Sequence, residues 1–125
     1  MEKLIEIINK PHETIKIDNN FVEIKTNVEL KKGYPLKLFI KRIDNNFYLT
    51  DNKNTLRFMN TIYQLTAPDV KQCINDIIHH YQLKIEKGEI LTPVTENNLA
   101  KRYNEFLICC CTLANMFIFF DDPNN

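Results

Sequence analysis

The chain has 125 residues, 44% of them hydrophobic and 26% charged, values typical of a single globular domain with a packed core. Its 16 basic and 16 acidic residues cancel, which excludes a bulk electrostatic attraction to nucleic acid or to anionic lipid. Segment 1–10 is charged throughout and lacks the apolar core of a signal peptide. We therefore expect one cytoplasmic domain over residues 1–125, with no membrane partner.

The first half of the chain predicts a short helix followed by strands. Apolar residues on one side of Glu2–Asn9 predict an amphipathic helix, which Pro11 ends. Asp- and Asn-rich turns then separate four predicted strands, at residues 14–17, 21–26, 36–42 and 47–50. Residues 27–35 are expected to form an irregular connection. In the third strand Leu36, Leu38 and Ile40 should face the core, while Lys37, Phe39 and Lys41 face water.

The second half predicts helices around a late hairpin. A short helix is expected near Leu56, and a longer one over 68–83, opened by Pro68. Residues 83–85 and Glu89–Val94 should form a hairpin, and Thr95 should cap a terminal helix over 98–120 that organises the core. The predicted fold is α+β: an antiparallel four-stranded sheet plus a late β-hairpin, packed on two longer helices, with a short N-terminal helix.

The four cysteines predict neither a disulfide framework nor a metal site. Cys109, Cys110 and Cys111 are consecutive on the terminal helix, where neighbouring side chains point about 100 degrees apart and cannot hold one ion together. Cys73 lies on the apolar side of the preceding helix. We expect all four to be reduced, mostly buried thiols.

The segment between Phe47 and Leu56 reads FYLTDNKNTL. It resembles a small domain-of-unknown-function family of Gram-positive bacteria and their phages, whose members carry a segment like Y-L-T-D-D-G-x-T-L. The later segments LKIEKGEILTPV and KRYNEFLICCC are similar as well. Family members often read T-P-F-x-D-R-x-x-D before the third strand, whereas this chain reads TNVELKKGY, with Leu30, Lys31 and Tyr34 at the acidic and arginine positions. The resemblance implies a fold and a source, and it brings no assigned activity.

Three groups of residues invite a catalytic or metal-binding interpretation, and each has a structural alternative. Asp51 could be a catalytic or metal-binding carboxylate at the end of a strand, or a residue that caps the next turn. Glu23 and Lys25, with Asp18, resemble a nuclease triplet, or simply alternate on the wet face of a strand. The histidines lack the spacing of helix-borne metal ligands, which favours solvated positions for His79 and His80 and leaves His12 without a partner.

A local basic patch is the best candidate for a partner-binding surface. It comprises Lys31, Lys32, Lys37, Lys41 and Arg42, with Phe39 among them. The patch could bind single-stranded nucleic acid, could protect an edge strand against aggregation, or could dock on a protein with Phe39 as its anchor.

The terminal helix also predicts self-association. Ile108 and Phe119 lie opposite the stripe that faces the core, so they need cover. Either the N-terminal helix folds over them or a second subunit does, and we expect a homodimer.

The sequence lacks several common catalytic motifs. It has only two glycines and no serine, so neither a phosphate-cradling loop nor a serine nucleophile is present. We expect no catalytic residues, no metal and no cofactor. The sequence favours a small phage or mobile-element accessory protein that binds a macromolecular partner, such as an anti-CRISPR-like inhibitor of a host defence system. The alternative is a nucleic-acid-binding or degenerate nuclease-like domain that uses the basic sheet face.

Overall fold

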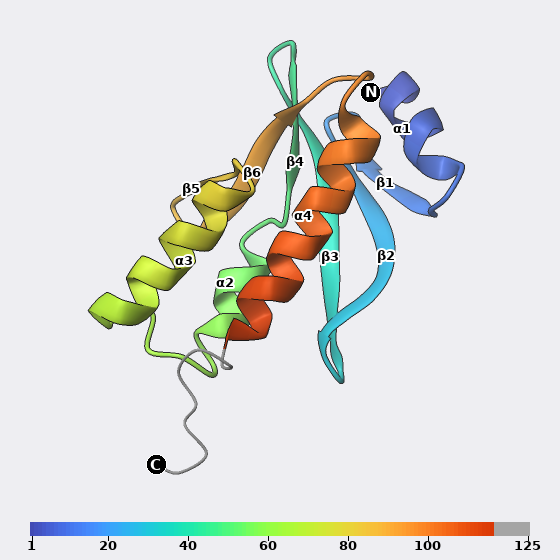
Figure 1. Cartoon of the computed structure of the whole chain (residues 1–125). Helices are drawn as coiled ribbons and strands as arrows, with labels where there is room; N and C mark the ends of the chain where they lie inside the picture. The colour runs from blue at the N-terminus through green and yellow to red at the C-terminus, as the bar shows by residue number, and fades with distance from the viewer. Residues whose placement is uncertain (117–125) are drawn as a thin grey trace.

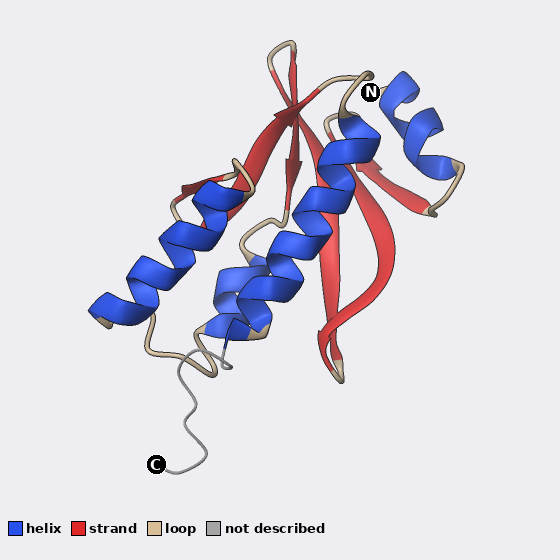
Figure 2. Cartoon of the chain, viewed as in Figure 1, coloured by secondary structure: helices blue, strands red, loops and turns tan. Residues whose placement is uncertain are grey.

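The computed structural model describes residues 1–116 (Figure 1). The elements in chain order are α1 (Glu2–Asn9), β1 (Thr14–Asp18), β2 (Phe21–Lys31), β3 (Tyr34–Ile43), β4 (Asn46–Thr50), α2 (Asn54–Met59), α3 (Pro68–His80), β5 (Lys84–Glu86), β6 (Glu89–Val94) and α4 (Leu99–Ala114). Figure 2 shows helices and strands in separate layers. The predicted α+β class is therefore confirmed.

All six strands belong to one antiparallel sheet, in the order β1-β2-β3-β4-β6-β5. The predicted four-stranded meander is present, but the late hairpin extends it, because β6 pairs with β4 through Leu49 and Thr92. Residues 51–88, which include α2 and α3, separate the two strands in the chain. Local sequence patterns carry no information about a pairing at that distance.

The helices cover one face of the sheet, and α4 lies across its middle (Figure 1). Helix α4 contacts each of the other three helices as well as β2 and β6. Leu99, Phe106 and Leu113 of α4 are fully buried, as are Ile24 and Leu38 on the sheet. Burying one such side chain contributes about 1.5–3 kcal/mol. The expectation that this helix organises the core is confirmed for the described residues.

The predicted irregular connection over residues 27–35 is wrong, because β2 and β3 run on to a tight turn at Gly33. The chain does break its regular pairing there: Lys25 pairs with Lys37, but Glu29 pairs with Pro35, so β2 carries extra residues. Such a bulge absorbs the irregular sequence without ending the strand.

Two predicted helix ends also shift. Helix α3 ends at His80 and not at Leu83, because Gln82 adopts a left-handed conformation with φ 56°. The Arg102 guanidinium on α4 satisfies the carbonyls of Tyr81 and Gln82 there, at 3.1 and 2.9 Å. At the start of α4, Asn98 accepts the Thr95 N–H at 2.7 Å, and the Thr95 side chain makes no capping hydrogen bond.

Within residues 1–116, each helix falls short of the length and hydropathy that crossing a membrane requires.

Candidate functional site

The face of the sheet that turns away from the helices forms a continuous surface, which we call the open face. No helix within residues 1–116 packs on it (Figure 1). Strand register aligns one residue from each strand in a single row across this face: Ile15, Glu23, Phe39, Thr50, Leu91 and Lys84. The expected inward and outward alternation of β3 is confirmed, since Leu36, Leu38 and Ile40 lie on the helix-covered side.

The centre of the open face is tightly packed even though no described helix covers it. Phe39 is only 5% exposed, and its ring stacks on that of Phe21 with 4.7 Å between centroids. Lys41 binds Glu89 at 2.9 Å, and the Thr50 hydroxyl donates to the same carboxylate. Because Lys41 is on β3 and Glu89 is on β6, this pair spans β4 and covers Thr50, which is fully buried. The centre is therefore a small second core.

Apolar side chains gather toward the β1 end of the open face. Ile15 and Ile17 on β1 are 44% and 53% exposed, and Ile43 at the end of β3 is 47% exposed. Ile17 shares the side of Ile15 because side chains two residues apart on a strand point to the same face, and the bulge after Lys16 sets Ile17 and Asp18 together opposite Phe21. We call Ile15, Ile17, Phe21 and Ile43 the apolar margin. Clustered exposed hydrophobics of this kind mark interaction surfaces.

The predicted basic patch is not one surface. Lys31 and Lys32 lie at the tip of the β2–β3 hairpin, and the length of β3 separates them from Arg42 at its other end. Arg42 faces the helix side, 5.8 Å from the Phe47 ring. Lys41 is on the open face, but Glu89 neutralises its charge. Among the basic residues of the predicted patch, Lys37 alone lies on the open face and makes no ion pair with a described residue. Phe39 has the predicted side but is too buried to be a projecting anchor.

The nuclease-like triplet is not assembled. Glu23 and Lys25 do lie on the open face, but Lys25 is 3.6 Å from Glu13. Asp18 accepts the Asn20 N–H at 2.7 Å in the adjoining turn. The described residues contain no cluster of three His, Cys, Asp or Glu side chains that could hold a metal ion.

Asp51 is a structural residue. It is fully buried, and its carboxylate accepts the N–H groups of Lys53, Thr55 and Ile90, each at 3.0 Å. These hydrogen bonds stabilise the start of α2 and connect the loop before it to β6. The structural alternative, in which Asp51 caps the next turn, therefore describes its role, and the bond to Ile90 adds a contact with β6. Burial raises the pKa of Asp51, partly offset by these hydrogen bonds.

The cysteines are free, as expected. Cys109 and Cys110 are buried, and burial raises the pKa of Cys109 to about 12. Cys73 and Cys111 are half-buried, and burial raises their thiol pKa values as well. Catalytic thiols need the opposite shift. His79 and His80 are exposed on the last turn of α3, as the sequence indicated.

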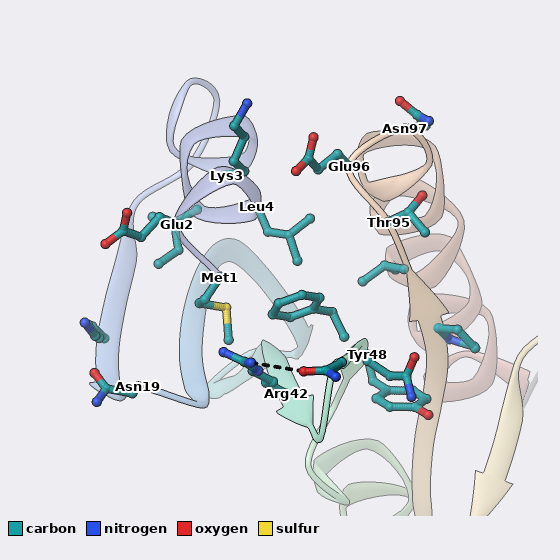
Figure 3. Close-up of a pocket in the computed structure, with 17 residues that line it drawn as sticks. Met1, Glu2, Lys3, Leu4, Asn19, Arg42, Tyr48, Thr95, Glu96 and Asn97 are labelled. Atoms are coloured by element: carbon teal, nitrogen blue, oxygen red, sulfur yellow. Dashed lines mark hydrogen bonds between the residues drawn. The ribbon is translucent and has the colours of Figure 1, made fainter.

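A groove of about 1010 Å³ opens between the N-terminal end of α1 and the segment that joins β6 to α4 (Figure 3). Lys3 and Glu96 stand on its opposite walls, Met1 lies deeper, near Arg42, and Lys16 of β1 contributes to the lining. Its Arg42 donates to the Asp44 carbonyl at 2.8 Å, which fixes the guanidinium in the hairpin.

The two residues predicted at a dimer interface have different outcomes. Ile108 is 54% exposed on α4, so it does lack cover. Helix α1 packs on α4 through Leu4 and Ile8, both 2% exposed, and leaves Ile108 open. Phe119 lies outside the described residues.

Sequence reasoning missed the residues that hold the open face together. The sequence pattern predicts Glu89 only as the start of a hairpin strand, and Ile15 and Ile17 only as members of a strand. The alternation of β1 does carry a signal, because Ile15 and Ile17 share one side of a strand whose other residues are polar or charged.

Fold and surface together define the class: a small α+β domain whose antiparallel sheet is covered by helices on one face. The chain belongs to the family described as Domain of unknown function DUF1828, whose model matches residues 26–112. The expectation that the chain belongs to a family of unknown function is thus confirmed. No curated protein and no solved structure matches the chain.

Proposed function

We propose that this protein is a non-enzymatic binding module that docks on another protein through the apolar margin of its open face. The observation that supports this most is the exposure of Ile15, Ile17 and Ile43, at 44 to 53%, on a face that no described helix covers. The Phe21 ring stacks on the buried Phe39 ring, which holds the aromatic part of the apolar margin in a fixed position.

Charge favours a protein over nucleic acid as the partner. Strong binding to phosphates requires several unpaired lysines or arginines along one track. On the open face Lys41 is bound to Glu89 and Lys25 lies 3.6 Å from Glu13, while Arg42 points to the other side. The nucleic-acid-binding alternative therefore has little free positive charge to use.

We further propose that the partner is a component of a bacterial host, as expected for an accessory protein of a phage or mobile element that inhibits host defence. This step rests on the sequence resemblance to a phage-associated family. The exposed isoleucines of the apolar margin give such a protein a surface with which to bind its target.

The test is a comparison of matched charge substitutions on exposed isoleucines. Ile17→Asp alters the apolar margin, whereas Ile62→Asp alters an isoleucine of similar exposure, 46%, in the connection after α2. Both variants should stay folded. We expect wild type and Ile62→Asp to capture the same protein from a host lysate and Ile17→Asp to lose at least about tenfold in affinity for it, measured afterwards with the purified partner. Equal affinities of the two variants would overturn the proposal.

A further inference from the structure

The outer edge of β1 offers unused backbone hydrogen-bonding groups. The Lys25 backbone N–H donates to the Glu13 carbonyl at 2.9 Å, so the backbone hydrogen-bonding groups of Glu13 point toward β2. Backbone groups of an antiparallel strand point to its two neighbours alternately. Ile15 therefore bonds toward β2, and the N–H and C=O groups of Thr14 and Lys16 point away from the sheet. Among the described strands, β1 pairs with β2 alone.

The two edges of the sheet differ in how they are protected. The opposite edge, β5, has only three residues, and two of them are the charged Lys84 and Glu86. Short, charged edges resist pairing with another chain. Strand β1 has five residues, contains no proline, and presents Ile15 and Ile17 at 44% and 53% exposure. Of the two edges, β1 is the one suited to accept a further strand.

The side chains of β1 specify what such a strand would carry. Ile15 and Ile17 lie on the open face, where apolar neighbours would match them. Lys16 lies on the helix side, at the rim of the groove, and makes no ion pair with any residue of segment 1–116. An acidic side chain beside Lys16 would complement it.

We propose that the partner protein supplies an extended segment that adds to the sheet beside β1, with apolar side chains alongside Ile15 and Ile17 and an acidic side chain facing Lys16. This inference rests on the proposed function and specifies how the docking occurs. Backbone hydrogen bonds to Thr14 and Lys16 would supply affinity, and the two isoleucines with Lys16 would supply selectivity.

Lys16 also argues against a second copy of this chain as the added strand. A two-fold antiparallel pairing that uses all five residues of β1 is centred on Lys16, its middle residue. Each Lys16 would then face the same lysine of the other copy, and like charges directly opposite are destabilising. The lysine therefore discriminates against self-pairing while it favours an acidic segment.

Amide hydrogen exchange read by NMR tests the inference directly. The probe is a blocked synthetic peptide of threonine, valine, glutamate, valine and threonine, and its match carries lysine in place of glutamate. In the free protein the Thr14 and Lys16 amides should exchange faster than that of Ile15. The glutamate peptide should slow both by at least about tenfold and leave Ile15 unchanged. The lysine peptide should have a much weaker effect.

Three variants of Lys16 separate backbone pairing from charge. Lys16→Pro removes the outward N–H together with the side-chain ammonium and leaves the N–H groups that face β2 in place, so an edge strand tolerates it, and it should abolish the slowing at Thr14. Lys16→Ala keeps that N–H and should retain part of the slowing. Lys16→Glu should reverse the preference between the two peptides, and it remains informative if the proline variant does not fold.

Each result either supports or overturns the inference. Unchanged exchange of Thr14 and Lys16 with the glutamate peptide overturns it, and so does a slowing that appears with protein concentration alone, which would identify a second copy. The proposed function is tested separately. If Ile17→Asp loses the captured protein while the peptide leaves these amides unchanged, the open face docks a partner without strand addition. If the peptide protects the amides but Ile17→Asp keeps full affinity, the proposed function fails instead.

Discussion

Asp51 shows how a single residue can look functional in a sequence and be structural in the fold. Its carboxylate is fully buried with no described cation beside it, and three backbone N–H groups surround it at 3.0 Å. Two physical effects compete there. Burial favours the neutral acid, whereas hydrogen bonds from N–H groups favour the carboxylate. The pKa of Asp51 is raised because burial is the larger effect.

That balance predicts a pH dependence of stability. A pKa raised in the folded state means that the folded chain binds the proton more tightly than the unfolded chain, whose Asp51 pKa is near 3.8. The stabilisation is thus fully present below that value and is lost as pH rises through the folded pKa. The amide in the Asp51→Asn variant cannot titrate, so we expect the stability of wild type relative to this variant to fall from about pH 3 to pH 7, measured by urea unfolding. A relative stability that rises over this range would show that the hydrogen bonds outweigh burial.

Among the elements, β3 shows what sequence can and cannot reveal. Its alternation of Leu36, Leu38 and Ile40 with charged residues correctly separates the two faces. The burial of Phe39 cannot be inferred in this way, because it depends on Phe21 and on the Lys41–Glu89 pair, which only the six-strand register brings together. The same register joins the late hairpin to β4. Local periodicity therefore predicts faces well, and it does not predict which distant strands become neighbours.

The burial of Phe39 predicts a stability effect where the sequence alone indicated an exposed anchor. Phe39→Ala removes a ring that is 5% exposed and stacked at 4.7 Å on Phe21, so it should lower the free energy of unfolding by about 3 kcal/mol. Tyr34→Ala is the matched control on β3, since Tyr34 is 49% exposed, and it should cost about 1 kcal/mol or less. Equal losses in chemical denaturation would mean that the open face has no second core.

At the scale of the whole molecule, the sheet is asymmetric in what covers it. All the described helices, including α1, gather on one face, so the other face depends on its own side chains for packing. The family match spans residues 26–112, whereas β1 and α1 precede it. The edge strand and one wall of the groove thus come from the part of the chain that the family model does not match. Sequence reasoning identified these elements but had no means of placing them at an edge.

Helix α1 also bears on the predicted homodimer. The sequence offers it as one of two candidates to cover Ile108, yet it packs Leu4 and Ile8 against α4 and leaves Ile108 54% exposed. A second subunit thus remains the predicted cover. Because a stable homodimer buries on the order of 1,200 Å² or more, Ile108 needs neighbours in such an interface, and Phe119 is the predicted companion.

We therefore expect wild type to sediment as a dimer and Ile108→Glu to sediment as a folded monomer, because a buried, unpaired carboxylate at the interface is costly. Ile62→Glu is the matched control, since Ile62 is 46% exposed in the connection after α2, and it should stay dimeric. Lys16→Pro should stay dimeric as well, because the β1 edge is inferred to pair with a strand of a different protein and not with a second copy of this chain. A monomeric wild type would contradict the predicted dimer. A dimer that only Lys16→Pro dissociates would move the interface to β1 and would contradict the inferred role of that edge.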